Sequence, residues 1–240
     1  MTLPNLPLSN PEDVIPCNKL KNLLDPTKAN LKPLITGGMY DYINNSSEGE
    51  TGIYIRKDSK GKVTNEIAPF TGTNSLPGKW GTSYYSEVHT HPKNVYPMFS
   101  YSDMMVLYNL EHQSYSYNRG HSSMLLVCED DNGIKQTYAV VFENTGAPIE
   151  NTLNNPNLIG KTQKEKLKAL DGILNKMYDK ELLKKTLDPS YNPNYERIFL
   201  QFCFGTNIGL YKADSNLINW SKLTISNNSD TATVTPTNCN

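Results

Sequence analysis

Alternating apolar and polar positions divide the middle of the chain into short strands. Residues 52–70 ("GIYIRKDSKGKVTNEIAPF") contain two alternating runs around the turn Asp58-Ser59-Lys60-Gly61, which predicts a β-hairpin. A third strand is predicted over 82–91 ("TSYYSEVHTH"). Two apolar strands follow over 122–129 and 134–143, joined by the turn signal "DNG".

Helical spacing of apolar residues is found before, between and after these strands in the sequence. Short helices are predicted over 18–24 and 29–35, with Pro33 limiting the second, and a longer helix over 100–113. Residues 160–187 have apolar residues on one face and lysines between them, which indicates an amphipathic helix with a solvated basic face. A very apolar helix over 195–204 and strands over 208–214 and 219–226 complete the pattern.

These elements predict an α+β fold (α/β/α-like), in which a mixed β-sheet is flanked by helices. We expect one domain over residues 17–226, with a core at 17–143 and a helical C-terminal elaboration at 144–226. Residues 1–16 are interpreted as an N-terminal arm, and the Ser/Thr/Asn-rich residues 227–240 as a flexible tail.

The composition narrows the function classes. The chain of 240 residues is 37% hydrophobic and 20% charged with a formal net charge of -1, so it has no basic excess that would indicate nucleic acid or an anionic membrane as a partner. The first residues have neither the positive start nor the apolar run of a secretory signal, and no later stretch is apolar enough for a membrane span. We therefore expect synthesis in the cytoplasm, with delivery out of the cell or association with a virion left open.

The four cysteines are far apart and form no C-x-x-C motif, so no zinc knuckle or thioredoxin-like motif is predicted. Cys128 and Cys203 lie in apolar runs and are expected to be buried as small hydrophobic residues. A reducing compartment fits this pattern. The same pattern is expected of a protein that a dedicated machine delivers out of the cell.

Two histidines stand one residue apart at the end of the predicted strand 82–91, in "EVHTHP". Because side chains alternate along a strand, His89 and His91 share a face with Cα atoms about 6.6 Å apart, and both imidazoles can reach one zinc ion. Asp103 opens the predicted helix 100–113 after a loop, "PKNVYPMF", long enough to bring the helix N-terminus over the strand end. A helix N-terminus favours the ionised carboxylate that a metal needs. Three protein ligands and an open position are typical of catalytic zinc.

The same segment has an interpretation without metal. "SYSD", Ser100 to Asp103, matches the S-x-x-[DE] capping box, which stabilises a helix N-terminus in any protein. Each part of the motif is common by itself. An H-x-H at a strand end followed at short range by S-x-x-D is far more specific, and it favours the metal site.

The pair "HTHP" and "FSYSD" resembles the JAMM motif of the JAB/MPN-type zinc metalloproteases, in which an upstream Glu precedes H-x-H-P, a loop and S-x-x-D. The resemblance implies a curved β-sheet flanked by helices and cleavage of isopeptide or peptide bonds. It also implies a set of zinc ligands: His89, His91 and Asp103. Ser100 would help to hold the oxyanion. Eight residues separate the second histidine from Ser100 where the family usually has seven, so Ser102 stays as an alternative.

The upstream Glu of the family acts as general acid and base and lies before a glycine and an apolar run. "EGETGIYI" fits that description, with Glu50 as our choice and Glu48 as the alternative. Glu87 shares the strand face of the two histidines. It is either a partner that orients an imidazole or an ordinary strand residue.

We therefore expect a zinc-dependent metallopeptidase or isopeptidase that hydrolyses an amide bond in a protein conjugate or a peptidoglycan peptide. The segment "IGLYKADSNLINWSKL" resembles the C-terminal part of JAB-like domains in bacterial toxin-like and phage-encoded proteins, which suggests an effector or virion enzyme with an immunity or assembly partner. The alternative is a catalytically inactive JAB-like structural or binding module. The chain has neither the H-x-E nor the P-C-x-x-C motif of a zinc deaminase, and it lacks the G-x-S-x-G motif of a serine hydrolase. The loops at 69–81 and 144–156 are the candidates for substrate contacts.

Overall fold

A single mixed sheet organises the protein. The computed structural model describes residues 11–45, 49–68, 72–143 and 159–239. Its 8-stranded sheet has the order β2-β1-β3-β4-β5-β6-β7-β8. The strands are β1 (Gly52–Lys57), β2 (Val63–Ile67), β3 (Tyr84–Thr90), β4 (Ser123–Glu129), β5 (Lys135–Phe142), β6 (Ile208–Ala213), β7 (Trp220–Ile225) and β8 (Val234–Asn238).

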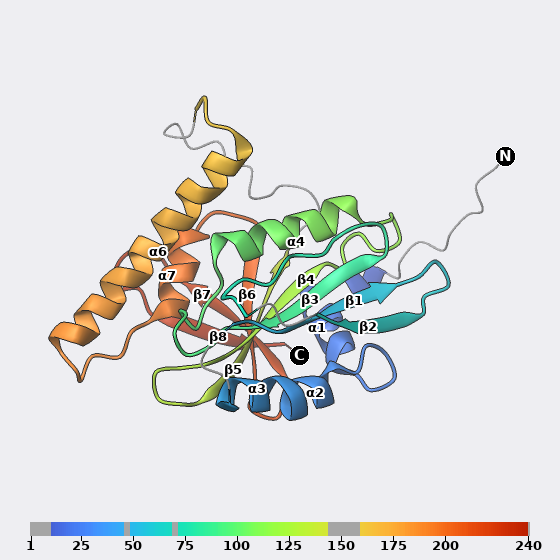
Figure 1. Ribbon diagram of the computed structural model, residues 1–240, viewed down its shortest axis with the longest axis horizontal. Coiled ribbons are helices and arrows are strands. Elements are labelled where there is room, and N and C mark those ends of the chain that lie inside the picture. Colours follow the sequence, from blue (N-terminus) through green and yellow to red (C-terminus); the bar gives the residue numbers. More distant parts are fainter. Residues whose placement is uncertain (1–10, 46–48, 69–71, 144–158, 240) are drawn as a thin grey trace.

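Helices cover both faces of the sheet (Figure 1). One face carries α4, α6 and α7, and the other carries α1, α2 and α3. The helical segments are η1 (Pro11–Val14), α1 (Pro16–Leu24), α2 (Leu31–Leu34), η2 (Ile35–Met39), α3 (Tyr40–Asn45), α4 (Tyr101–Gln113), α6 (Gln163–Leu187) and α7 (Tyr195–Phe202).

Burial on both sides explains the apolar central strand. In β4, Leu126 and Cys128 pack beneath α4, α6 and α7, while Leu125 and Val127 pack against the layer of α1 to α3. A strand between two helical layers buries every position, so its sequence is a continuous apolar run instead of an alternation. The predicted α+β fold with a mixed sheet and flanking helices is confirmed.

Strands β3 and β4 form the parallel pair of the sheet, with His89 opposite Leu126. Parallel neighbours need a crossover connection, and α4 provides it. Because α4 follows β3 through a short loop, its first turn lies beside the C-terminal end of β3. This connection brings residues 89 to 103 together.

The helical region after α1 is longer than predicted. Pro33 does not limit it, because the chain continues through a wider π-helical turn at Ile35–Met39 into α3. Pro33 lies in the first turn of α2, where backbone N–H groups have no intrahelical acceptor, so its missing N–H removes no hydrogen bond.

The expected flexible tail is wrong for residues 234–239. Val234–Asn238 form the edge strand β8, which pairs antiparallel with β7 from Ser221 to Ile225. Cys239 then forms a disulfide with Cys17 at the start of α1, with Cα atoms 5.5 Å apart. Sequence reasoning missed this disulfide, which fits an oxidising environment better than the expected reducing one. Cys128 and Cys203 are free and buried, as predicted.

In the described part of the chain, no helix has the length and apolar character needed to cross a membrane. Residues 1–10 of the predicted arm lie outside the described residues, and Pro11–Val14 form η1.

Candidate metal centre

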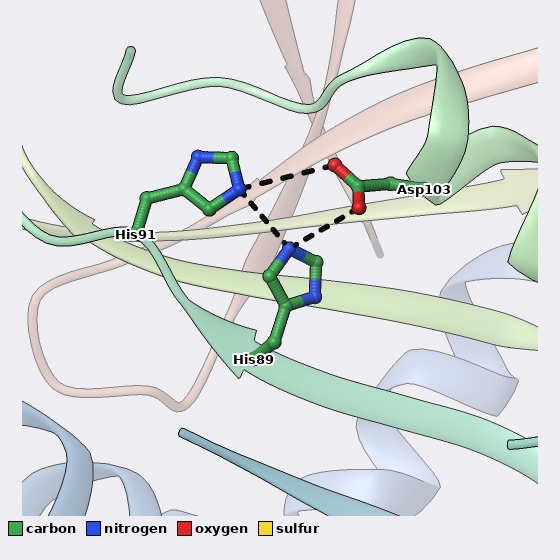
Figure 2. Close-up of side chains that lie close together, drawn as sticks. All are labelled: His89, His91 and Asp103. Atoms are coloured by element: carbon green, nitrogen blue, oxygen red, sulfur yellow. Dashed lines mark hydrogen bonds and ion pairs between the residues drawn. The ribbon is translucent and has the colours of Figure 1, made fainter. Parts of the chain in front are cut away.

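The end of β3 holds the two histidines. His89 lies in the strand, and His91 follows its last residue, with its backbone N–H donating to the Val127 carbonyl at 3.0 Å. Both rings point to the same side, and their Nε2 atoms are 3.3 Å apart (Figure 2). Both side chains are almost fully buried. The alternation of a β-strand therefore produces the shared face predicted for the pair.

Asp103 reaches the histidines from the first turn of α4. Its Oδ1 is 3.6 Å from His89 Nε2, and its Oδ2 is 3.9 Å from His91 Nε2. One ligand-capable atom from each of the three residues lies within 4.8 Å of the others, so this group could hold a metal ion. Figure 2 shows the three side chains converging from the strand end and the helix N-terminus.

The capping box is present at the same place. The Ser100 N–H donates to Asp103 Oδ2 at 2.7 Å, and the Asp103 N–H donates to Ser100 Oγ at 3.2 Å. The two interpretations of "SYSD" are therefore compatible: the cap uses Oδ2 and fixes the carboxylate, while Oδ1 faces His89. A reciprocal cap at the positive end of a helix also favours the ionised carboxylate.

The neighbouring loop sets the tautomer of His91. Its Nδ1 is 2.7 Å from the backbone oxygen of Tyr96. A carbonyl oxygen only accepts, so Nδ1 carries the hydrogen and Nε2 presents a lone pair toward His89 and Asp103. Burial lowers the pKa of His89, which favours its neutral, ligating form. Among the described residues, none accepts or donates a hydrogen bond at His89 Nδ1.

Glu50 lies two residues before the start of β1, next to the site. Its Oε2 accepts a hydrogen bond from the Leu76 N–H at 2.8 Å, and its Oε1 is 3.9 Å from His91 Nε2. The close approach of β3 requires Gly52, because a Cβ there would lie 2.7 Å from the Val88 backbone oxygen; it would also lie 2.3 Å from Leu76 Cδ2. The glycine after the glutamate thus has a physical role. The alternative, Glu48, lies outside the described residues.

The two candidate serines differ in their partners. Ser102 Oγ donates to Asp171 Oδ2 at 2.6 Å, and its N–H donates to Asp171 Oδ1 at 3.0 Å, so its hydroxyl hydrogen is engaged with α6. Ser100 Oγ accepts from the Asp103 N–H, which leaves its hydrogen available to donate. Both serines line the cavity described below, and the free donor favours Ser100.

Glu87 is buried in β3, two residues before His89, and lines the same cavity as the histidines. Its Oε2 accepts a hydrogen bond from the Lys79 backbone nitrogen at 3.5 Å. Within the described residues its carboxylate forms no hydrogen bond or ion pair with either imidazole ring, so it does not orient one here. Burial raises the pKa of Glu87 well above its usual range, and the nearby carboxylates of Asp103 and Glu50 raise it further. Both effects favour the protonated form of Glu87.

A cavity of about 670 Å³ opens over these groups. Its walls include Asn74, Ser75 and Leu76 from the predicted substrate loop 69–81, and Lys93 to Pro97 from the loop after His91. The other predicted loop, 144–156, lies outside the described residues.

Sequence reasoning missed the contribution of α6 to the cavity. Asp171, Asn175 and Leu182 line the cavity, and Tyr195 of α7 also lines it. These residues are about 70 or more positions away from the motif, and no local pattern links them to it. The paired bonds from Ser102 to Asp171 are the contact that joins the two regions.

Comparisons with protein-family models, with curated proteins and with solved structures find no match for this chain. The resemblance to the JAMM family therefore depends on the motif.

Proposed function

We propose that this protein is a zinc-dependent metallopeptidase or isopeptidase of JAMM type, which hydrolyses an amide bond in a protein conjugate or a peptidoglycan peptide. The observation that carries the proposal is the joint position of His89, His91 and Asp103 in one buried group with the carboxylate of Glu50 beside it. A capping box alone needs neither the converging histidines nor this second carboxylate.

The donor set fits zinc. Two nitrogen ligands at about 2.1 Å from a tetrahedral zinc ion are roughly 3.4 Å apart. The Nε2 atoms of His89 and His91 are 3.3 Å apart, close to this value. Two imidazoles and one carboxylate leave a coordination position open, as catalytic zinc sites require. Zinc would be held by His89 Nε2, His91 Nε2 and Asp103.

The proposed reaction needs a Lewis acid, a group that transfers a proton, and a hydrogen-bond donor to the oxyanion. Bound zinc would supply Lewis acidity to a water molecule and to the scissile carbonyl. Glu50 accepts the proton of the attacking water on Oε1 and donates it to the leaving nitrogen, while the Leu76 N–H holds its other oxygen. Ser100 donates its free hydroxyl hydrogen to the developing oxyanion. The asymmetric hydrogen bonding of Glu50 and the free donor of Ser100 support these roles.

The partners of this proposed enzyme are a protein or peptide substrate and, for an effector or virion enzyme, an immunity or assembly partner. The JAB/MPN assignment and the toxin-like or phage-associated context depend on sequence resemblance. The mixed sheet between two helical layers is consistent with that fold.

Metal content tests the site. Elemental mass spectrometry after dialysis should find about one zinc per chain in the wild type. His89→Ala should remove it. The matched control is His112→Ala, because His112 is an exposed histidine on α4 that binds the Tyr108 carbonyl of its own helix. If the wild type takes up no zinc, or if His89→Ala retains it, the metal site is refuted and the capped helix alone explains the motif.

Turnover tests the catalytic roles. Glu50→Gln should keep zinc and reduce turnover of an isopeptide or peptidoglycan-peptide substrate by about 10²- to 10⁴-fold, because an amide cannot carry the proton. Ser102→Ala is the control, and it should keep turnover within a few-fold. Full activity of Glu50→Gln would exclude Glu50 as the base. Zinc binding without hydrolysis of either substrate class would favour the inactive module.

A further inference from the structure

A second hollow lies away from the metal centre, between α1, the β1–β2 hairpin and the start of β3. Its volume is about 490 Å³, and we call it the lysine pocket. Two of its lining residues mark the start of the parallel strands: Tyr85 is the second residue of β3, and His121 lies two residues before β4. His89 lies near the opposite end of β3. The two sites are therefore at different ends of the sheet.

The lining of the lysine pocket is strongly cationic. It contains four lysines and one carboxylate, that of Asp13; the lysines are Lys19, Lys28, Lys57 and Lys62. Asp13 is 3.7 Å from Lys28, which also donates to the Asn22 side chain at 2.6 Å. In the described part of the chain, nothing accepts a hydrogen bond from the side chain of Lys57 or Lys62. Both lysines line the hollow, and neither ammonium group has a hydrogen-bond or ion-pair partner among the described residues.

One of the four lysines is buried. The side chain of Lys19 is held beneath the surface, with Nζ donating to the Gly120 oxygen at 3.1 Å and the Phe142 oxygen at 3.2 Å. Burial lowers its pKa to about 8, and the nearby carboxylates of Glu111 and Glu143 oppose that shift and favour the charged form. An ammonium group has three hydrogens to donate, and two carbonyls use two of them. The third hydrogen of the Lys19 ammonium is available to an anionic ligand.

His121 supplies a separate indication of a ligand. It is 7% exposed, packs edge-on against Tyr85, and has no hydrogen-bond partner at Nε2 among the described residues. Most buried polar atoms in proteins have a partner, so a buried nitrogen without one is a candidate ligand contact. Its surroundings are positive, with Lys57 having the largest electrostatic effect on it.

We propose that the lysine pocket binds a small organic anion through a phosphate or carboxylate group. Lys57 and Lys62 supply free ammonium donors, Lys19 a buried one, and His121 an unpartnered ring nitrogen. Leu23, Val63 and Tyr85 form an apolar wall against which the body of the ligand packs. The volume lies in the range of small-molecule sites, and ammonium groups are common ligands of phosphate. A solvated lysine surface would need neither the buried Lys19 nor the hollow.

Calorimetric titration of the full chain with inorganic phosphate and with pyrophosphate tests the proposal, in a buffer free of other multivalent anions and at 0.15 M NaCl. Both probes should bind, and Lys57→Gln combined with Lys62→Gln should weaken binding at least tenfold. Lys60→Gln is the matched control, because Lys60 lies in the same hairpin outside the pocket, and it should change the affinity less than twofold. Absence of binding would overturn the proposal. An equal loss of affinity in Lys60→Gln would also overturn it, because it would indicate diffuse charge attraction instead of a specific pocket.

Two further readouts locate the bound anion. The imidazole resonances of His121 should shift on titration with phosphate, while those of the exposed His112 should not. Affinity for phosphate should be unchanged in His89→Ala, which separates this pocket from the proposed metal centre. Binding that leaves His121 unshifted, or that disappears in His89→Ala, would place the anion elsewhere and refute the lysine pocket as its site.

Discussion

At the residue scale, Asp103 shows how one side chain serves two structural purposes. One carboxylate oxygen closes the capping box with Ser100, and the other faces His89. The cap is a local interaction of the helix N-terminus, so it orients the carboxylate independently of a metal. A side chain oriented in advance loses less conformational entropy when a metal binds.

His121 should also affect stability, because burial and the nearby lysines lower its pKa to about 4. The unfolded chain has a histidine pKa near 6.5, so between pH 4 and 6.5 the unfolded state binds more protons than the folded state. The free energy of unfolding therefore falls as pH decreases through this window. The contribution of His121 to that fall is on the order of 3 kcal/mol.

Urea unfolding from pH 4 to 7 in phosphate-free buffer measures this contribution. The stability of His121→Gln relative to wild type should rise as pH decreases from 6.5 to 4, because the variant lacks the group that must stay neutral. His112→Gln should follow the wild-type curve. A constant difference between His121→Gln and wild type across the window would contradict the prediction.

At the element scale, the packing of α7 against α6 positions the residues of both helices that line the metal-site cavity. Glu181 of α6 is buried, and its Oε1 accepts from Arg197 of α7 at 2.7 Å. Its Oε2 accepts from the Tyr191 hydroxyl at 2.6 Å and from the Asn194 N–H at 3.2 Å, in the loop between the helices. This single carboxylate therefore joins α6, the connecting loop and α7.

Removing Glu181 should destabilise the protein strongly. Glu181→Ala leaves the buried Arg197 guanidinium without its carboxylate partner, so we expect a loss of about 3–5 kcal/mol in the free energy of unfolding. Lys184→Ala is the matched control, because Lys184 binds the same carboxylate but its side chain is 45% exposed. That variant should lose less than about 1 kcal/mol. Equal losses in the two variants, measured by urea denaturation, would refute the role of the buried pair.

The elements that sequence reasoning predicted are those set by local patterns. The hairpin of β1 and β2, the capped helix α4 and the apolar strand β4 each have a signal within about ten residues. The H-x-H pair was predictable for the same reason, since strand alternation is local. The partner of Ser102 on α6 was not, because only tertiary packing brings Asp171 beside it.

At the scale of the whole molecule, the two ends of the described chain meet. The segment from Val234 to Asn238 has a polar sequence typical of a mobile tail, yet it forms the edge strand β8. Its pairing with β7 and the bond from Cys239 to Cys17 are long-range effects that composition does not report. Pro236 is tolerated there because an edge strand has one side without sheet partners.

The Cys17–Cys239 disulfide should contribute substantially to stability. It closes a loop with a sequence separation of 222 residues, for which chain entropy predicts about 5 kcal/mol; measured contributions are typically 2–4 kcal/mol. We therefore expect reductant, or the double variant Cys17→Ser and Cys239→Ser, to lower the free energy of unfolding by about 2–5 kcal/mol. Reductant should have no further effect on the double variant.

Thiol titration of the denatured wild type without reductant should detect only Cys128 and Cys203. Four reactive thiols in protein purified under oxidising conditions would show that the bond does not form, and β8 would then depend on its pairing with β7 alone.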